Sequence, residues 1–308
     1  MSRLIRQCRG DFGLAEEALQ EAVSTARAAW ATEGTPQKPR LWLEQVAQQK
    51  ALAWLQRQSP TEPAALSGEP QPLDAQNADY LRLIWMCCHP ALGMGTRVAL
   101  MLRSVCGLSI EEIARALELE PVTLQRRLMR ARQKLRLAPV PYAVPSQAEL
   151  APRLAAVLEV VYEVFSTGYA AYSSEALVPE ALRLGRLLTG LLPSESEPWA
   201  LLALMLLQDS RSAARLSKSG ELVPLADQDR SLWNGAQIAE GLGCLDRALG
   251  LGGLSEYALH AAIAAHHARA RTLEQTDWAQ IALLEQRLTS HEEPAARSSV
   301  RRLSELVD

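Results

Sequence analysis

The chain has 308 residues, of which 48% are hydrophobic and 22% charged, and its formal net charge is −3. This length predicts two or three domains with buried cores, and the abundance of Leu and Ala favours helices. The five cysteines have no disulfide spacing and the first segment has no apolar signal sequence, which excludes a disulfide-rich secreted class. No run of 18 apolar residues occurs, which excludes a membrane-spanning class. We therefore expect a cytoplasmic protein with reduced thiols.

The charge is distributed unevenly along the chain. Residues 1–149 carry 18 Lys and Arg against 15 Asp and Glu, a net charge of +3, whereas residues 150–308 carry 14 against 20, a net charge of −6. Six cations and no acid lie within residues 121–136, PVTLQRRLMRARQKLR. The first half is therefore the better candidate for a polyanionic partner, and the acidic second half is a candidate to fold back on this basic segment.

Helical periodicity dominates the first half of the chain. Apolar residues recur every three or four positions over 14–30 and 40–57, which predicts two helices. The stretch SPTEPAALSGEPQPLD, residues 59–74, is rich in Pro, Ser and Gly and predicts a flexible linker. Two further apolar helices are predicted over 77–88 and 93–106.

The next segment has the pattern of a helix-turn-helix. Ser109 is a good N-cap for a short helix, and Glu112 stands where a capping-box partner is required. Pro121 suits the first position of a second helix. The side chains of that helix predicted to face inward are Leu124, Leu128, Ala131 and Leu135.

In helix-turn-helix motifs the second helix enters the major groove of DNA. Its early side chains reach base edges, while flanking cations hold phosphates. The side chains placed for base edges are Thr123, Gln125, Arg126 and Arg127. The cations placed for phosphates are Arg130, Lys134 and Arg136.

The second half is again helical after a proline-rich stretch at 139–146. Pairs of helices of this length and spacing are typical of a helical-repeat domain, although no strict 34-residue signature is present. Ser219-Gly220 predicts a small hairpin within the interruption at 214–230. The helices are predicted over 148–167, 176–192, 197–209, 231–249, 255–270 and 276–290.

Two other groups of side chains resemble chemical sites. Cys87, Cys88 and His89 are adjacent, and adjacent ligands rarely close one tetrahedral site, so we expect no metal there. The mixed charges between Asp209 and Arg230 lack both a nucleophile–base pair and a phosphate loop. This favours a network of ion pairs over an enzyme active site.

The segment GLSIEEIARALELEPVTLQRRLMRARQKLR resembles region 4 of sigma factors, the bacterial subunits that direct RNA polymerase to promoters. The chain is most similar to the extracytoplasmic-function (ECF) group, and within it to members with a long helical, TPR-like C-terminal extension. Other stretches extend the resemblance over nearly the whole chain: DFGLAEEALQEAV, LRLIWMCCHPAL, RLAAVLEVVYEVFSTGYAA, LLALMLLQDSRSAARLSKSGELVPLADQDRSLWN and TDWAQIALLE.

The resemblance implies an all-α protein of three parts that is not an enzyme. Residues 1–58 would form a region 2-like helical domain, residues 77–138 a region 4-like helix-turn-helix domain, and residues 148–308 a helical extension that tunes activity. Linkers at 59–76 and 139–147 would join them. The implied partner is core RNA polymerase, the implied ligand is promoter DNA, and no cofactor is implied.

The resemblance also assigns binding roles. Region 2 would dock on the polymerase through the 14–30 helix, where Glu16, Glu17 and Glu21 offer acids to a basic clamp surface. Lys134 would hold a phosphate next to the base-reading residues. The residues that would read the −35 element are Thr123, Gln125, Arg126, Arg127 and Arg130.

One stretch departs from the family pattern. Region 2 usually ends in a helix like ARNRAIDRLRR, and the matching stretch here is AQQKALAWLQR, residues 47–57. Only Lys50 and Arg57 keep a positive charge for promoter DNA, and each lost phosphate contact lowers affinity. Three interpretations stay open: a working factor with an unusual promoter preference, a factor that needs help, and a degenerate sigma-like protein that acts as a protein-interaction regulator.

Overall fold

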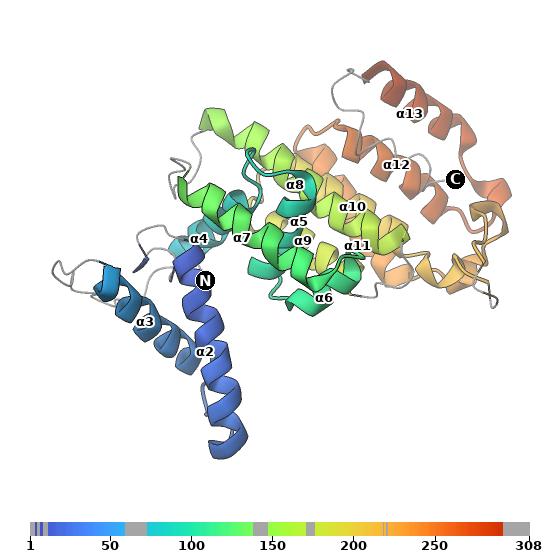
Figure 1. The fold of residues 1–308 in the computed structure, drawn as a ribbon. Coiled ribbons are helices and arrows are strands. Elements are labelled where there is room, and N and C mark those ends of the chain that lie inside the picture. Colours follow the sequence, from blue (N-terminus) through green and yellow to red (C-terminus); the bar gives the residue numbers. More distant parts are fainter. Residues whose placement is uncertain are drawn as a thin grey trace. The chain divides into compact units, whose positions relative to one another are not determined.

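The computed structural model describes residues 4, 7–8, 12–58, 73–137, 147–170, 176–217, 219 and 221–291. Within these residues the chain is all-helical, as the sequence predicts, and it forms no strand beyond one isolated antiparallel bridge between Leu216 and Leu222 (Figure 1). That bridge is consistent with the small hairpin predicted there, although Gly220 of the predicted turn lies outside the described residues. Most of the two predicted linkers, namely 59–72 and 139–146, lies outside the described residues.

The α-helices agree with the periodicity of the sequence to within a few residues at most ends. Four short 3₁₀ turns, η1 to η4, lie between the later helices. The α-helices are α2 (Phe12–Glu33), α3 (Pro39–Gln58), α4 (Leu73–Cys87), α5 (Met94–Ser104), α6 (Ile110–Ala116), α7 (Pro121–Leu137), α8 (Gln147–Ala170), α9 (Leu177–Leu191), α10 (Ser196–Asp209), α11 (Gly235–Gly250), α12 (Glu256–Arg269) and α13 (Trp278–His291).

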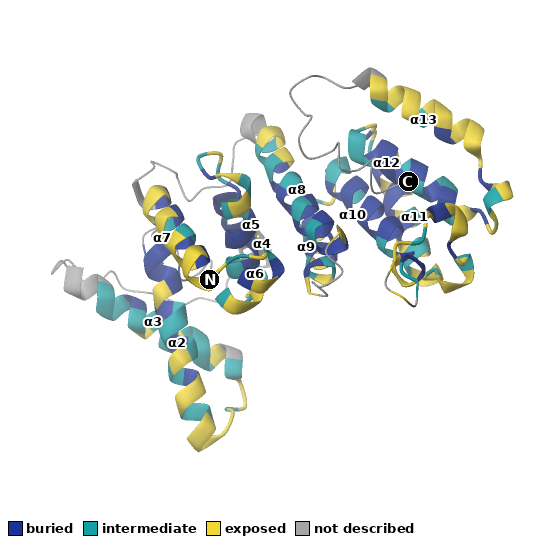
Figure 2. Cartoon of the chain, turned by 45° about the vertical axis from the view of Figure 1, so that its right-hand side comes forward, coloured by how far each residue is buried: buried dark blue, intermediate teal, exposed yellow. Residues whose placement is uncertain are grey.

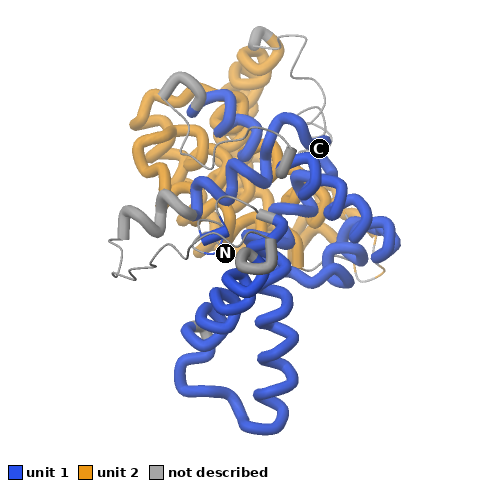
Figure 3. Tube along the Cα trace, turned by 60° about the vertical axis from the view of Figure 1, so that its left-hand side comes forward, with its two compact units in different colours: residues 1–157 blue, residues 158–308 orange. Residues whose placement is uncertain are grey.

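The chain divides into two compact units, residues 1–157 and residues 158–308 (Figure 3). The segments predicted as a region 2-like domain and as a helix-turn-helix domain share the first unit. The division falls inside α8, whereas the sequence predicts that the extension begins at residue 148. Each unit is described by itself below.

In the first unit, α2 and α3 form a helical hairpin. Its interface is made of small side chains, including Ala18, Ala22, Ala47 and Ala51, each with at most 1% of its surface exposed. Such side chains allow two helices to approach closely. The rings of Trp30 and Trp42, with centroids 5.6 Å apart, pack together near the loop that joins the helices.

Helices α4 to α7 surround the second core of this unit. Five consecutive residues of α5, Val98 to Leu102, are buried, and the helix contacts α4, α6 and α7. The stripe predicted on α7 is buried as well, with Leu124 at 0% and Leu128 at 1% exposure. Burial of this stripe fixes which side of α7 faces outward.

In the second unit, α10 is the central helix. Ten of its residues, Pro198 and Ala200 to Gln208, are buried, and Figure 2 shows the helix almost uniformly buried between its neighbours. It contacts α9, α11 and α12. A helix that is apolar on all sides needs such a position, because every face must be covered.

Close contact between α10 and α11 depends on the small size of Gly241. A Cβ atom placed on Gly241 would lie 2.9 Å from Cγ of Leu207 on α10 and 3.3 Å from Cβ of Leu206. Gly243, on the same helix, has no atom within 4 Å of its hypothetical Cβ. Gly241 is therefore a packing residue, whereas Gly243 is not.

Within the stretch 209–230, where the sequence predicts a network of ion pairs, two arginines also donate to backbone carbonyls. Arg230 donates through Nη1 to the carbonyls of His267 (2.6 Å) and Ala270 (2.8 Å) at the end of α12. Arg215 donates to the carbonyl of Tyr169 (2.9 Å) and stacks over its ring. Carbonyls at helix ends lack intrahelical donors and carry partial negative charge, so they attract guanidinium groups.

Candidate nucleic-acid interface

The short helix α6 is fixed at its start by the predicted capping box. The Ser109 hydroxyl accepts a hydrogen bond from the Glu112 amide (3.1 Å), and the Glu112 carboxylate accepts one from the Ser109 amide (2.6 Å). These bonds from Ser109 lower the pKa of Glu112 below its ordinary value. The cap satisfies amides that would otherwise lack partners and sets where α6 begins.

A tight turn separates α6 from α7. Its residue Glu118 has a φ of 52°, in the left-handed region, and the Leu119 amide donates to the Ala114 carbonyl (2.8 Å). The turn thus lies slightly earlier than the predicted Leu119-Glu120. Pro121 opens α7, as predicted from its fixed φ and missing donor.

The outward side of α7 is strongly cationic. Arg126, Arg130 and Lys134 are exposed, and Arg127 is half-buried. Thr123, in the first turn, is exposed as well. The helix contains no acidic residue, so its outer surface attracts anions.

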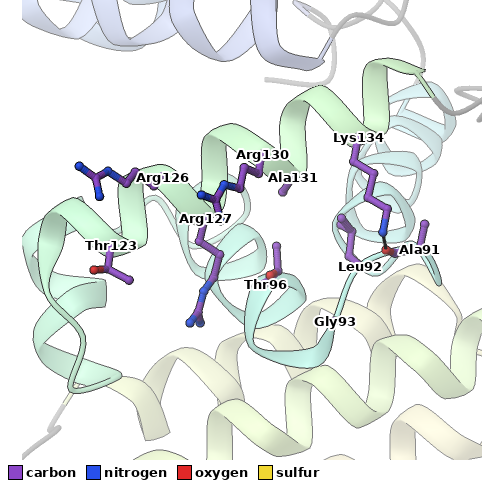
Figure 4. A pocket seen from close by; sticks show the side chains of 10 residues that line it. All are labelled: Ala91, Leu92, Gly93, Thr96, Thr123, Arg126, Arg127, Arg130, Ala131 and Lys134. Atoms are coloured by element: carbon purple, nitrogen blue, oxygen red, sulfur yellow. Dashed lines mark hydrogen bonds between the residues drawn. The ribbon is translucent and has the colours of Figure 1, made fainter.

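A groove of about 430 Å³ runs between α7 and the segment 91–96 (Figure 4). None of the described residues that line it is acidic. Lys134 donates through Nζ to the Ala91 carbonyl (2.5 Å) at one end, and the Arg127 guanidinium extends to within 3.2 Å of a Cβ built on Gly95. The groove is lined by Ala91, Leu92, Gly93, Thr96, Thr123, Arg126, Arg127, Arg130, Ala131 and Lys134.

The groove also contains the N-terminal end of α5. Gly93 is the N-cap of that helix and provides no capping side chain. The first turn of a helix carries partial positive charge on its amides. Together with the four cations of α7, this makes the groove suited to phosphate groups.

Five of the seven predicted DNA-binding residues of α7 therefore line one groove. Gln125 does not, and the side chain of Arg136 lies outside the described residues. Gln125 is exposed, but at about 100° of rotation per residue it lies roughly 160° around the helix from Thr123. The predicted base-reading residues thus do not share a single face. The five that the structure brings together are Thr123, Arg126, Arg127, Arg130 and Lys134.

The opposite flank of α7 is held by Glu16 of α2. The Glu16 carboxylate accepts from Nε of Arg132 (2.8 Å), lies 2.5 Å from Nη2 of the same guanidinium and 3.7 Å from Nε of Arg103. Only 1% of Glu16 is exposed. The expectation that Glu16 offers its charge to a polymerase surface is therefore wrong for this arrangement, because two arginines of the same unit already surround it.

The other two predicted polymerase contacts remain at the surface. Glu17 is exposed, and Glu21 is half-exposed in an ion pair with Lys50 (3.4 Å). Lys50, predicted to contact DNA, thus lies beside a predicted polymerase contact. An exposed pair of this kind is weak and leaves both groups available to partners. The side chain of Arg57 lies outside the described residues.

The Cys87-Cys88-His89 segment has a structural role. Both thiols are buried, and burial raises the pKa of Cys87 well above its ordinary value. His89 accepts a hydrogen bond from the Ala91 amide through Nδ1 (3.1 Å), which shapes the turn beside the groove. Within the described ranges no cluster of three or more His, Cys, Asp or Glu side chains is arranged to hold a metal ion.

Comparisons with known proteins agree with this geometry. Residues 82–135, which include α5, α6 and most of α7, match the family described as sigma-70, region 4. The chain is also 40% identical over 306 residues to the uncharacterized protein R00370 of Rhizobium meliloti (strain 1021), covering 94% of this chain and 72% of that protein. The chain belongs to one family with this rhizobial protein, and its region 4 segment supports membership of the sigma-70 family.

A second family model matches a later part of the chain. Residues 153–249 match a family of unknown function, DUF6596. No solved structure matches the chain. A sigma-70 region 4 implies interaction with RNA polymerase and promoter DNA in a transcription role. Among the helices that are described, no stretch combines the length and apolarity of a membrane span.

Proposed function

We propose that this protein is an ECF-type sigma factor of the cytoplasm that directs core RNA polymerase to a set of promoters and has a regulatory helical extension. The observation that carries the proposal is the cationic, acid-free groove side of α7, presented by a capped helix-turn-helix. In this proposal the N-terminal part of α7 enters the major groove at the −35 element, and Arg130 and Lys134 bind flanking phosphates. No catalytic step is involved.

Run-off transcription with core polymerase, genomic promoter fragments and the full chain tests the proposal. Transcripts that require the protein are expected. Arg126→Ala and Arg130→Ala should each weaken binding to the duplex and reduce the slope of log affinity against log salt by roughly one. Arg247→Ala, an exposed arginine of α11, is the matched control and should leave both unchanged.

A second candidate function is that of a protein-interaction regulator without promoter opening. It is favoured by α3, where Gln48, Gln49, Trp54 and Gln56 stand at positions that carry polar or cationic DNA contacts in the family pattern. If the protein binds polymerase but yields no transcripts from promoters to which its helix-turn-helix binds, the regulator function is supported over the sigma factor function.

We further propose that the extension restrains α7 electrostatically. The support is the contrast between the +3 charge of residues 1–149 and the −6 charge of residues 150–308. Removal of the chain from residue 148 onward should then increase affinity for duplex DNA at low salt. Unchanged affinity, with α7 still folded by hydrogen exchange, would eliminate this restraint while leaving the promoter-binding proposal intact.

A further inference from the structure

Two exposed apolar side chains stand on the cationic outer face of α7. Val122 is 56% exposed and Met129 is 60% exposed. Seven residues separate them, so at about 100° per residue they lie within roughly 20° of one line along the helix. Arg126 lies between them along the helix, about 40° around the axis from Val122 and about 60° from Met129. We call Val122, Arg126 and Met129 the outer ridge.

The outer ridge lies away from the core of the unit. The buried stripe that includes Leu124 and Leu128 occupies the opposite side of α7, and the groove lies along one flank. Val122 and Met129 therefore gain little from folding, and their exposure to water is unfavourable. Apolar contact in a complex would give these two side chains a role that folding alone does not.

The charge around the ridge identifies the kind of partner. Arg126 lies on the ridge and Arg130 beside it, both exposed, and no carboxylate occurs on α7. A polyanion is complementary to this surface. Val122 is the second residue of α7, and in a helix-turn-helix the N-terminal residues of the second helix approach base edges.

We infer that Val122 and Met129 read thymine C5-methyl groups in the major groove, an inference that rests on the proposed promoter-binding function. The thymine methyl is the apolar group that a base pair presents in the major groove. Val122 would contact one thymine near the entry of α7, and Met129 a second one about two helical turns farther along. Arg126 between them would hydrogen-bond to a guanine or a phosphate.

Uracil substitution tests this inference directly. It removes the methyl group of a thymine and leaves the Watson–Crick hydrogen bonds of the base pair intact. A duplex that binds the full chain together with core polymerase is first selected from a random library. Each thymine in the part of this duplex that the protein covers is then replaced by deoxyuridine, one at a time, and the affinity of the protein for the duplex is measured.

For the unmodified chain, two positions should each lose about fourfold in affinity, the amount expected for one buried methyl group. Val122→Ala should lower affinity for the thymine duplex by a similar factor and abolish the uracil effect at one of the two positions. Met129→Ala should abolish it at the other. Leu41→Ala, which truncates an exposed apolar side chain of α3, should leave both uracil effects in place.

The outcomes separate the two proposals. If DNA binding is salt-dependent but both uracil effects persist in Val122→Ala and Met129→Ala, thymine reading is overturned and promoter binding is not. Loss of polymerase affinity in these variants, with DNA binding unchanged, would make the ridge a protein contact and also overturn it. Absence of DNA binding by the chain with polymerase would instead remove the proposed function itself. Since both side chains are exposed, the substitutions should change folding stability very little.

Discussion

The buried Glu16 carboxylate on α2 and the partly exposed Arg132 guanidinium on α7 form an ion pair between segments 116 positions apart in the sequence. Arg103 of α5 approaches the same carboxylate. A buried ion pair contributes little net stability, but removing one partner leaves an uncompensated charge. This carboxylate is one of the contacts that connect the helical hairpin to the helix-turn-helix.

Replacement of Glu16 by Gln should loosen this connection. The loss of the carboxylate leaves Arg132 and Arg103 facing each other, so we expect α2 to lose about 3 kcal/mol of protection. Hydrogen exchange of the α2 and α7 amides measures this. Glu17→Gln, at the exposed neighbouring position, should change protection by less than about 0.5 kcal/mol. Equal exchange in both variants would show that the ion pair does not hold α2 in place.

The turn before α7 offers a stabilising substitution. Glu118 has a left-handed backbone, which disfavours residues with a Cβ atom, so Glu118→Gly should raise the free energy of unfolding of the helix-turn-helix by about 0.5–1 kcal/mol. Glu120→Gly, in the same connection but without a positive φ, should lower it instead. Chemical denaturation followed by circular dichroism compares the two. A loss of stability in Glu118→Gly would contradict the turn geometry.

Two glycines of α11 should respond oppositely to the same change. Gly241→Ala places a methyl group 2.9 Å from Cγ of Leu207, and the overpacking should cost about 1–3 kcal/mol. Gly243→Ala has open space and should stabilise α11 by about 0.5–1 kcal/mol through helix propensity. Thermal unfolding of the two variants measures this difference. If both substitutions are stabilising, α10 and α11 are farther apart than the structure shows.

Acid should destabilise the second unit through His260. Burial lowers the pKa of this side chain to about 4 from an ordinary value of 6.5. In the unfolded chain the His260 side chain therefore binds a proton as the pH falls below 6.5, whereas in the folded chain the same side chain stays neutral until about pH 4. Stability is complete above pH 6.5 and decreases toward pH 4, by about 2 kcal/mol between pH 7 and pH 5.

Urea denaturation at pH 7 and pH 5 checks this effect. His260→Gln should remove most of that decrease, whereas His266→Gln, at a more exposed position of α12, should retain it. Identical pH dependence in all three proteins would rule out His260 as the source.

The helices could be predicted from the sequence because their signals are local. Apolar periodicity, the Ser109 cap and Pro121 each act within a few residues, and the structure confirms the helix-turn-helix that they predict. The buried stripe of α7 followed from the same pattern. Even Gln125, which lies away from the groove, could have been separated from Thr123 by helix geometry alone.

The contacts between distant segments could not be predicted in this way. The GLAEEAL stretch contains two adjacent glutamates, and nothing local distinguishes the buried Glu16 from the exposed Glu17. Their difference depends on which helix covers α2, a property of the tertiary fold. Likewise, the carbonyls that accept hydrogen bonds from Arg215 and Arg230 belong to other helices, and no local pattern in the sequence points to them.

The reach of Arg230 has a consequence for where the extension ends. The match to the family of unknown function stops at residue 249. The Arg230 side chain inside that stretch nevertheless donates hydrogen bonds to the carbonyls of residues 267 and 270, beyond its end. A fragment that ends at residue 249 would lack α12, so one side of α10 would be uncovered and the Arg230 guanidinium would lose these acceptors. The boundary given by sequence similarity is thus not a domain boundary, and the smallest fragment that folds independently has to include α12.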